Sequence, residues 1–204
     1  MRHIKATAII PFAICVTVIS ACASGGQERR PIDPPSWTPP QPTGSPVAGP
    51  VTGSAPYWCD LVSKLALTHI SGASAHLSEI RNSTDTENLT ICGVNDKERY
   101  GPLIVQWNVT GGRVIVADWT NSIASDHPTA LPAQLGTGFI VYSLREAKLP
   151  YITTAAFHCG PRDAWIQIFV RGFSQGRDTT KGLTALMRIA ERRFGALHHC
   201  TPKP

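Results

Sequence analysis

Six cysteines are the residues with the clearest chemistry in this chain, and their positions separate them into two groups. Cys15 and Cys22 lie near the N-terminus, within or directly after an apolar stretch. The other four are widely spaced through the rest of the chain: Cys59, Cys92, Cys159 and Cys200. None of them forms a CxxC pair, so their spacing indicates neither a zinc ribbon nor a thioredoxin-like motif.

The N-terminus has the features of a leader that is removed after export. Arg2 and Lys5 supply positive charge ahead of residues 6–20, which are uncharged and mostly apolar. This stretch is shorter than the roughly 20 residues that a membrane-spanning helix needs, and it has the length of a signal-peptide core. It ends in the sequence ISAC at residues 19–22, which resembles a bacterial lipobox.

The lipobox resemblance implies that residues 1–21 are a lipoprotein signal peptide and that the Cys22 thiol receives a diacylglyceryl group. Two acyl chains hold a protein at a membrane far better than one, so the resemblance implies a lipid anchor at the extracytoplasmic face of the cell membrane. Ordinary signal-peptidase cleavage after Ala23 remains an alternative. It would remove Cys22 and release a soluble, secreted protein.

Export also bears on the four remaining cysteines. An even number of widely spaced cysteines in an exported domain predicts two disulfides. Three pairings are possible, and we favour Cys59–Cys92 and Cys159–Cys200 because each joins neighbours along the chain. Bridges that close loops of this size stabilise a fold by about 2–4 kcal/mol each.

Composition divides the exported chain into a tether and one domain. Residues 22–56, which follow the signal peptide, contain nine prolines mixed with Gly, Ser and Thr, a composition typical of an extended, disordered linker. Residues 57–204 are long enough to bury one core. Removing residues 1–21 takes away two bases and no acids, which lowers the formal charge from +5 to +3. So small a charge predicts no nucleic-acid partner.

Hydrophobic periodicity predicts an α+β domain with an antiparallel sheet of about five or six strands and helices at both ends packed on it. Trp58 and the apolar residues up to Leu65 have helical spacing. A hairpin turn is predicted at Thr110-Gly111-Gly112, between two strands that are rich in β-branched and aromatic residues. Strands are expected over residues 89–94, 103–109, 113–119, 138–144, 152–159 and 164–171, and a capped helix over residues 179–196. Three tryptophans are expected in strands, as core residues: Trp107, Trp119 and Trp165.

One segment matches a catalytic motif. Ser174 is the central residue of GFSQG, a G-x-S-x-G pattern between a strand and a helix, which resembles the nucleophile elbow of small esterases. That resemblance implies a secreted serine hydrolase. However, Asp178 or Glu191 with His198 or His199 would have to complete the triad, and these follow too closely to lie on later strands. We therefore interpret the segment as a glycine-rich loop and expect no catalytic residue.

Two other features suggest binding chemistry only weakly. His198-His199-Cys200 and His158-Cys159 could ligate a metal, but adjacent side chains diverge and the thiols are better used in disulfides, so no metal site or cofactor is expected. The last helix carries the bases Lys181, Arg188, Arg192 and Arg193. We interpret them as a solvated face, with contact to anionic lipid headgroups as the alternative.

The whole pattern resembles the small secreted lipoproteins of unknown function found in actinobacteria. The features that carry the resemblance are the lipobox ending at Cys22, the Pro-rich tether, the sequence CDLV at residues 59–62 and the later cysteines. It is similar, too, to the disulfide-linked extracellular sensor domains of mycobacterial receptor kinases. Together these likenesses imply a non-enzymatic, lipid-anchored module of the cell envelope that binds a small ligand or an envelope protein. A deep apolar pocket lined by the strands would favour the ligand, and its absence would favour a structural envelope protein.

Overall fold

The computed structural model describes residues 51–73, 76–84, 89–96, 101–146 and 148–204. The predicted signal peptide, Cys22 and residues 23–50 of the predicted tether lie outside the described residues. In the part that is described, no helix is both long enough and apolar enough to cross a membrane.

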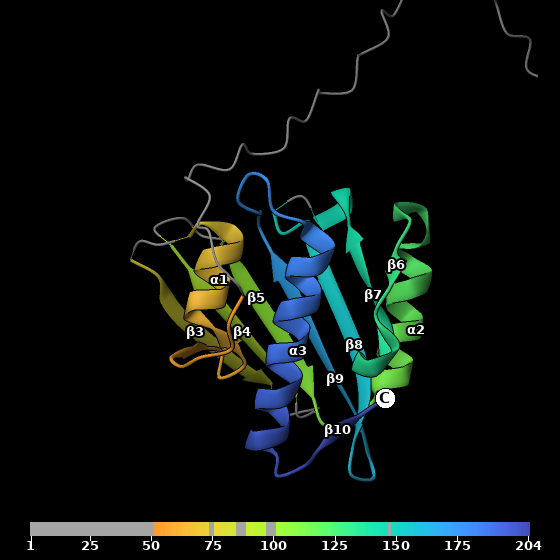
Figure 1. Ribbon diagram of the computed structural model, residues 1–204. Helices are drawn as coiled ribbons and strands as arrows, with labels where there is room; N and C mark the ends of the chain where they lie inside the picture. Colours follow the sequence, from red (N-terminus) through yellow and green to blue (C-terminus); the bar gives the residue numbers. More distant parts are fainter. Residues whose placement is uncertain (1–50, 74–75, 85–88, 97–100, 147) are drawn as a thin grey trace, which may run out of the picture. The chain divides into compact units, whose positions relative to one another are not determined.

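An antiparallel sheet is the central element of the described domain (Figure 1). Its strands lie in the order β3-β4-β5-β9-β8-β7-β6, and β10 pairs with β8. The strands are β3 (Ser78–Thr84), β4 (Leu89–Asn95), β5 (Leu103–Asn108), β6 (Thr129–Ala130), β7 (Thr137–Tyr142), β8 (Tyr151–Cys159), β9 (Arg162–Val170) and β10 (Pro202–Lys203). The α+β class and the antiparallel sheet are confirmed, but eight strands are described rather than five or six.

The additional strands are those whose sequences carry little strand signal. The β3 segment, SEIRNST, is polar and forms an edge of the sheet. Such an edge strand buries few side chains, so hydrophobic alternation does not reveal it. The strands β6 and β10 have two residues each, which is too short for any periodicity.

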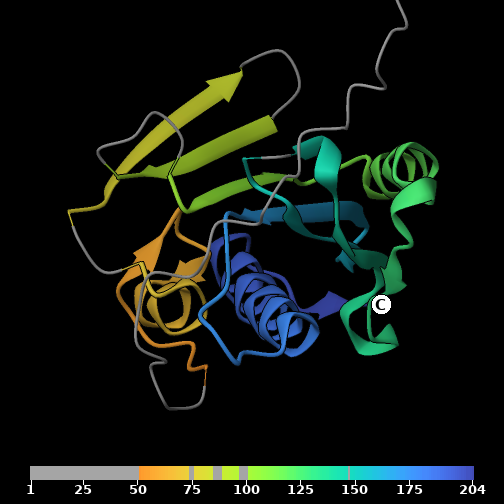
Figure 2. The same ribbon diagram turned by 90° about the horizontal axis from the view of Figure 1, so that it is seen from above.

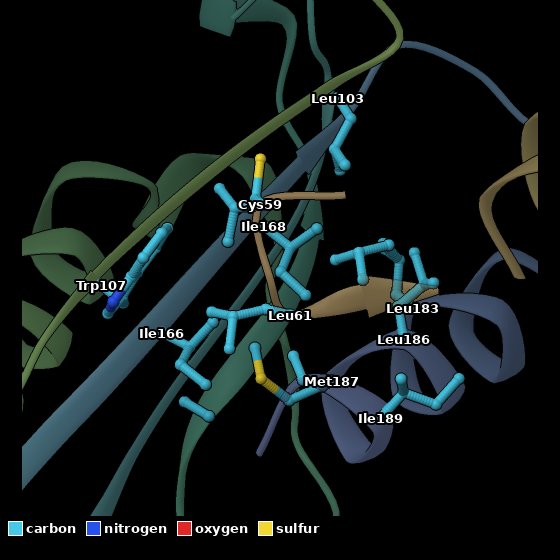
Figure 3. Packing of buried hydrophobic residues seen from close by; sticks show 14 of the residues in the cluster. Cys59, Leu61, Leu103, Trp107, Ile166, Ile168, Leu183, Leu186, Met187 and Ile189 are labelled. Atoms are coloured by element: carbon cyan, nitrogen blue, oxygen red, sulfur yellow. The ribbon is translucent and has the colours of Figure 1, made fainter. Parts of the chain in front are cut away.

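Helices cover the two faces of the sheet unequally. Figure 2 shows α1 (Lys64–Ser71) and α3 (Thr179–Leu197) on one face and α2 (Gly112–Ser122) on the other. The larger core lies between the sheet and the pair α1 and α3, and Figure 3 shows part of it. It includes Leu61, Leu103, Ile166, Ile168, Leu183, Leu186 and Met187, all fully buried. Short 3-10 turns lie at Ala124–Asp126, Ala133–Leu135 and Leu144–Glu146.

The C-terminal helix is confirmed almost to the residue. We predicted residues 179–196, and α3 spans Thr179–Leu197. Its apolar stripe is buried against the sheet, as the periodicity indicated. The Asp178 carboxylate accepts a hydrogen bond of 3.0 Å from the Lys181 backbone N–H, which satisfies an otherwise unpaired donor of the first turn.

The first helix begins later than predicted. Residues 57–63 form a small ladder of β1 (Tyr57–Trp58) and β2 (Val62–Ser63), and the turn between them places Cys59 and Asp60 at positive φ. The helix α1 begins only at Lys64, where Ser63 caps it by accepting from the Ala66 N–H. The apolar spacing from Trp58 to Leu65 therefore reflected a buried turn residue, Leu61, and a buried strand residue, Val62, followed by a helix.

The predicted strand over residues 113–119 is wrong, since these residues belong to α2. Gly111 adopts the left-handed conformation (φ 82°) that a hairpin would also use, but here the residue precedes a helix. The strand β5 pairs with β4 on one side and β9 on the other, so no edge is open to a strand following it. Within the segment Val116 is buried against the sheet, and Ile123, which follows the helix, is buried as well, whereas Val114 is exposed. Tertiary context overrides strand propensity here.

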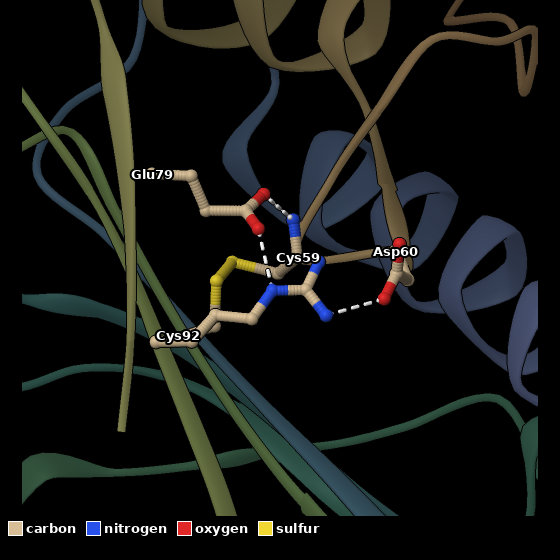
Figure 4. Close-up of a disulfide and its surroundings, with 5 residues drawn as sticks. Cys59, Asp60, Glu79 and Cys92 are labelled. Carbon is tan, nitrogen blue, oxygen red and sulfur yellow. Dashed lines mark hydrogen bonds and ion pairs between the residues drawn. A yellow bond between two sulfur atoms is a disulfide. The ribbon is translucent and has the colours of Figure 1, made fainter. Parts of the chain in front are cut away.

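Both favoured disulfides, Cys59–Cys92 and Cys159–Cys200, are present, with Cα separations of 5.6 and 5.3 Å. Figure 4 shows the first of them beside a polar cluster. The Glu79 carboxylate accepts from the Cys59 N–H at 2.6 Å, and Arg81 pairs with both Glu79 and Asp60. The bridge and these bonds attach the β1–β2 turn to strands β3 and β4.

The approach of α2 to the sheet depends on Gly112, and we expect Gly112→Ala to destabilise the domain. A Cβ atom at Gly112 would lie 2.6 Å from the Ala164 carbonyl oxygen and 3.0 Å from the Ala156 Cβ. Relieving this overlap costs about 1–3 kcal/mol, measurable as a lower urea midpoint. Gly93→Ala is the matched control, because its Cβ would meet nothing closer than 3.8 Å. Equal midpoints for the two variants would contradict the close packing of α2.

Candidate ligand-binding site

A groove lies between α2, with the turn that precedes it, and strands β4, β5 and β9, on the face of the sheet away from α1 and α3. It is lined by Leu89, Gln106, Asn108, Thr110, Gly111, Val114, Ile115, Trp119 and Trp165. Its volume is about 600 Å³, within the range of natural small-molecule sites. It differs from the deep apolar pocket lined by strands that would favour a ligand-binding module, because five of its described lining residues belong to the β5–α2 turn and to α2.

Strand alternation explains why amides of β5 face the groove. Successive side chains of a strand point to opposite faces. Leu103, Val105 and Trp107 therefore face the large core under α1 and α3. Gln106 and Asn108, the alternate residues, point to the face that carries α2.

The turn from β5 into α2 is held by side-chain bonds at both ends. The Asn108 Oδ1 atom accepts from the Thr110 backbone N–H at 3.1 Å and from the Thr110 hydroxyl at 3.3 Å. Gly111, which precedes α2, supplies no side-chain cap. The Asp163 carboxylate of β9 accepts from the Arg113 N–H at 3.0 Å instead, so the neighbouring strand supplies the missing cap.

Aromatic rings form one wall and the floor. Trp119 is half-buried and meets Phe169 edge to face, with ring centroids 5.8 Å apart and planes at 66°. This contact fixes the indole on the α2 side of the groove. Trp165 is only 4% exposed and lies deep. At the rim, Val114 is 64% exposed, an unusual position for a large aliphatic side chain at the first turn of a helix.

The walls of the groove carry no charge: among the described lining residues, all are apolar, amide, hydroxyl or glycine. One buried amide beside it has an unused acceptor. Gln167 is the register partner of Gln106 on β9, and its Nε2 donates to the Thr154 hydroxyl at 2.9 Å. Its Oε1 atom is buried without a hydrogen-bond partner among the described residues.

Ser174 is not placed as a nucleophile. It is 3% exposed and lies against the end of α1, where its N–H donates to the Ile70 carbonyl at 2.7 Å. The hydroxyl has no hydrogen-bond partner among the described residues. His198 follows the other end of α3, whose 19 residues span about 28 Å. The structure therefore does not bring Ser174 together with His198 or His199.

Other residues were considered from the sequence as members of a catalytic triad. Among them, Asp178 caps a helix, and Glu191 and His198 lie partly or fully inside the fold. Asp178 caps α3, and the bond from the Lys181 N–H lowers the pKa of its carboxyl. Glu191 is 6% exposed, and burial raises its pKa to about 8, with Arg188 opposing the shift. Burial also lowers the pKa of His198, with smaller effects of Arg162 and His199 in the same direction.

The residues considered as metal ligands from the sequence include two that form a disulfide and one that packs on an aromatic ring. Cys200 and Cys159 form a disulfide, and His198 packs on the Phe194 ring at 4.2 Å between centroids. Within the described residues, three potential ligands lie within 4.8 Å of one another: Cys59, Glu79 and Cys92. Both sulfurs belong to the disulfide of Figure 4, so they do not offer thiolates to an ion.

The basic residues of α3 differ in their contacts. The Arg193 guanidinium lies 4.2 Å from the centre of the Tyr57 ring, and its Nε donates to the Asp60 carbonyl. Lys181 pairs with Asp178 at 3.6 Å. Arg188 and Arg192 are exposed. One base thus fastens the residues before α1, one pairs with the capping carboxylate, and the other two are exposed.

Sequence reasoning missed the groove residues, because it assigned α2 as a strand. Trp119 was expected in the strand core but lies on the helix, whereas Trp107 and Trp165 are buried in strands as expected. Ile115, Val116, Trp119 and Ile123 recur at spacings of one, three and four residues, and this signal could have revealed the helix. Comparison with known proteins adds no assignment: no family model, no curated protein and no solved structure matches the chain.

Proposed function

We propose that this chain is a non-enzymatic binding protein of the cell envelope, held by lipid at Cys22 on the outer face of the cell membrane, and that its groove at α2 binds a small ligand. The groove carries the proposal. A concave site of about 600 Å³ that combines apolar walls with a few amide groups has the composition of natural ligand sites.

The anchor is supported by the sequence alone. Residues 1–21 and Cys22 have the pattern of a lipoprotein leader. The protein from its native host should then begin at Cys22 and carry acyl chains, as measured by intact mass and by incorporation of labelled palmitate. Cys22→Ser should abolish incorporation. A secreted protein that begins after Cys22 would contradict the anchor and leave the groove proposal standing.

Ligand binding can be tested with an uncharged, apolar dye. The protein is residues 23–204, the whole exported chain without the acyl site, secreted behind an ordinary leader. N-phenyl-1-naphthylamine should bind in a saturable way and gain fluorescence. Val114→Glu should weaken binding at least about tenfold, because it places a carboxylate at the rim of an uncharged groove.

A matched control exists on the opposite face of the sheet. Leu65 is an exposed aliphatic residue (43%) in the first turn of α1, as Val114 is in the first turn of α2. Acidic residues are tolerated in a first helical turn, so both glutamate variants should fold. Leu65→Glu should bind the dye as the unchanged chain does. Equal loss in both variants, or no saturable binding at all, would contradict the proposal.

A further inference from the structure

The walls of the groove restrict the chemistry of its ligand, and this inference rests on the proposed binding function. None of the described lining residues is ionisable. A charged ligand entering the groove would lose hydration and meet no opposite charge among the described lining residues, which disfavours its binding. The ligand class that fits is therefore uncharged.

The amides argue against a purely apolar ligand such as an acyl chain. Gln106 of β5 lines the groove with a partly exposed amide, whereas the next residue on the same face, Asn108, is 8% exposed and holds the Thr110 turn. An acyl chain over the Gln106 amide would displace water from it and return no hydrogen bond.

Trp119 adds a flat apolar surface on the α2 side. Its ring is half-buried and fixed edge to face against Phe169. An aromatic face of this kind packs against the C–H face of a sugar ring, while amides on the adjacent strand bond the hydroxyl groups at the ring edge. Val114 and Ile115 extend the apolar surface next to Trp119 along the helix.

We infer that the groove binds an uncharged sugar unit, stacked on Trp119 and hydrogen-bonded by the amide of Gln106. A neutral hexose or pentose of a cell-envelope glycan has this chemistry: a ring with an apolar face, hydroxyls at the rim and no charge. Its hydroxyls would reach the groups that β5 presents.

Saturation-transfer NMR on the exported chain, residues 23–204, tests this ligand class. The probes are uncharged disaccharides of glucose, galactose, mannose and arabinose, with glucuronic acid disaccharides as the charged comparison and N-phenyl-1-naphthylamine as the apolar one. At least one uncharged disaccharide should give saturation transfer and displace the dye. Gln106→Leu should weaken that sugar at least about tenfold more than it weakens the dye, whereas Leu65→Glu should change neither.

The outcomes separate this inference from the proposed function. Dye binding without binding of any uncharged sugar would overturn the sugar assignment and leave the groove as a ligand site. A preference for the acidic disaccharides, or equal sugar binding by Gln106→Leu, would overturn the assignment as well. Absence of both sugar and dye binding would overturn the proposed function itself. Trp119→Phe, which keeps an aromatic ring, provides a second variant: we expect weaker sugar binding in a folded protein.

Discussion

Replacing Cys159 and Cys200 together by alanine should lower the free energy of unfolding by about 4 kcal/mol, as the entropy of closing a loop of this length implies. The bridge joins residues 41 apart. It attaches the segment after α3 to the end of β8, where Pro202 and Lys203 pair with Cys159 and His158.

Local packing supports a large effect at this bridge. The Cys200 N–H donates to the Gly195 carbonyl at 2.9 Å, and a Cβ atom at Gly195 would lie 2.6 Å from both the Cys200 oxygen and Pro202. The end of α3 and the last strand are therefore packed closely around the disulfide. Alanine is the appropriate replacement because Cys159 is fully buried, and a serine hydroxyl there would lack a partner.

Urea unfolding without reductant measures the effect. The Cys59 and Cys92 double alanine variant is the matched comparison: its loop of 33 residues predicts nearly the same loss, again about 4 kcal/mol. Adding reductant should destabilise the wild-type protein. It should leave a variant in which all four bridge cysteines are replaced by alanine unaffected. A loss below about 1 kcal/mol for either pair would contradict the role of the bridges in holding this fold.

Glu191→Gln should stabilise the protein above pH 5, increasingly so up to about pH 8. Glu191 is buried on α3, and its Oε1 atom has no hydrogen-bond partner among the described residues. Burial raises the pKa of its carboxyl from 4.5 to about 8. The folded state therefore retains a proton that the unfolded state releases between these two pH values.

The sign of the pH dependence follows from that difference. Between pH 4.5 and 8 the folded state binds more protons than the unfolded state, so the stability of the unchanged chain falls as pH rises. Each pH unit in this window costs about 1.4 kcal/mol, and the whole window from 4.5 to about 8 costs about 5 kcal/mol. Glutamine keeps the shape of the protonated acid without titrating, so the variant lacks this fall.

The quantity to compare at each pH is the difference in the free energy of unfolding between Glu191→Gln and the wild-type protein. His198 has a pKa lowered by burial and contributes the opposite slope below its unfolded value, since the folded state disfavours its protonation. That contribution is common to both chains and cancels in the difference. Urea unfolding at pH 5, 6.5 and 8 should show a gap that widens with pH. Parallel curves for Glu191→Gln and the unchanged chain would contradict the buried, protonated state of Glu191.

The parts of the fold that could be predicted from sequence are those with strong local signals. The α3 helix has an apolar stripe of 3.6-residue period and an acidic cap at Asp178. The β8–β9 hairpin has two long apolar strands around a glycine turn, with Gly160 at φ 65°. The disulfide pairing followed from chain order, because each bridge connects two cysteines that are consecutive among the last four of the chain.

The candidate site could not be predicted, because it depends on the conformation of one segment. Residues 113–119 have high strand propensity, and only the occupation of both edges of β5 by β4 and β9 excludes them from the sheet. Once α2 is assigned as a strand, Gln106 and Asn108 are ordinary strand residues, and no groove exists. Pairing across the sheet is a long-range property that a local pattern does not contain.

The most direct test of the groove as a ligand site is a map of amide chemical shifts upon titration with an uncharged ligand that binds in the dye assay. The protein is the exported chain, residues 23–204, labelled with ¹⁵N. We expect the side-chain amides of Gln106 and Asn108, the Trp119 indole N–H and the backbone from Thr110 to Ile115 to shift together with one dissociation constant, while resonances of α1 and α3 stay in place. Shifts that cluster around α1 and α3 and leave Gln106, Asn108 and Trp119 unmoved would contradict the account.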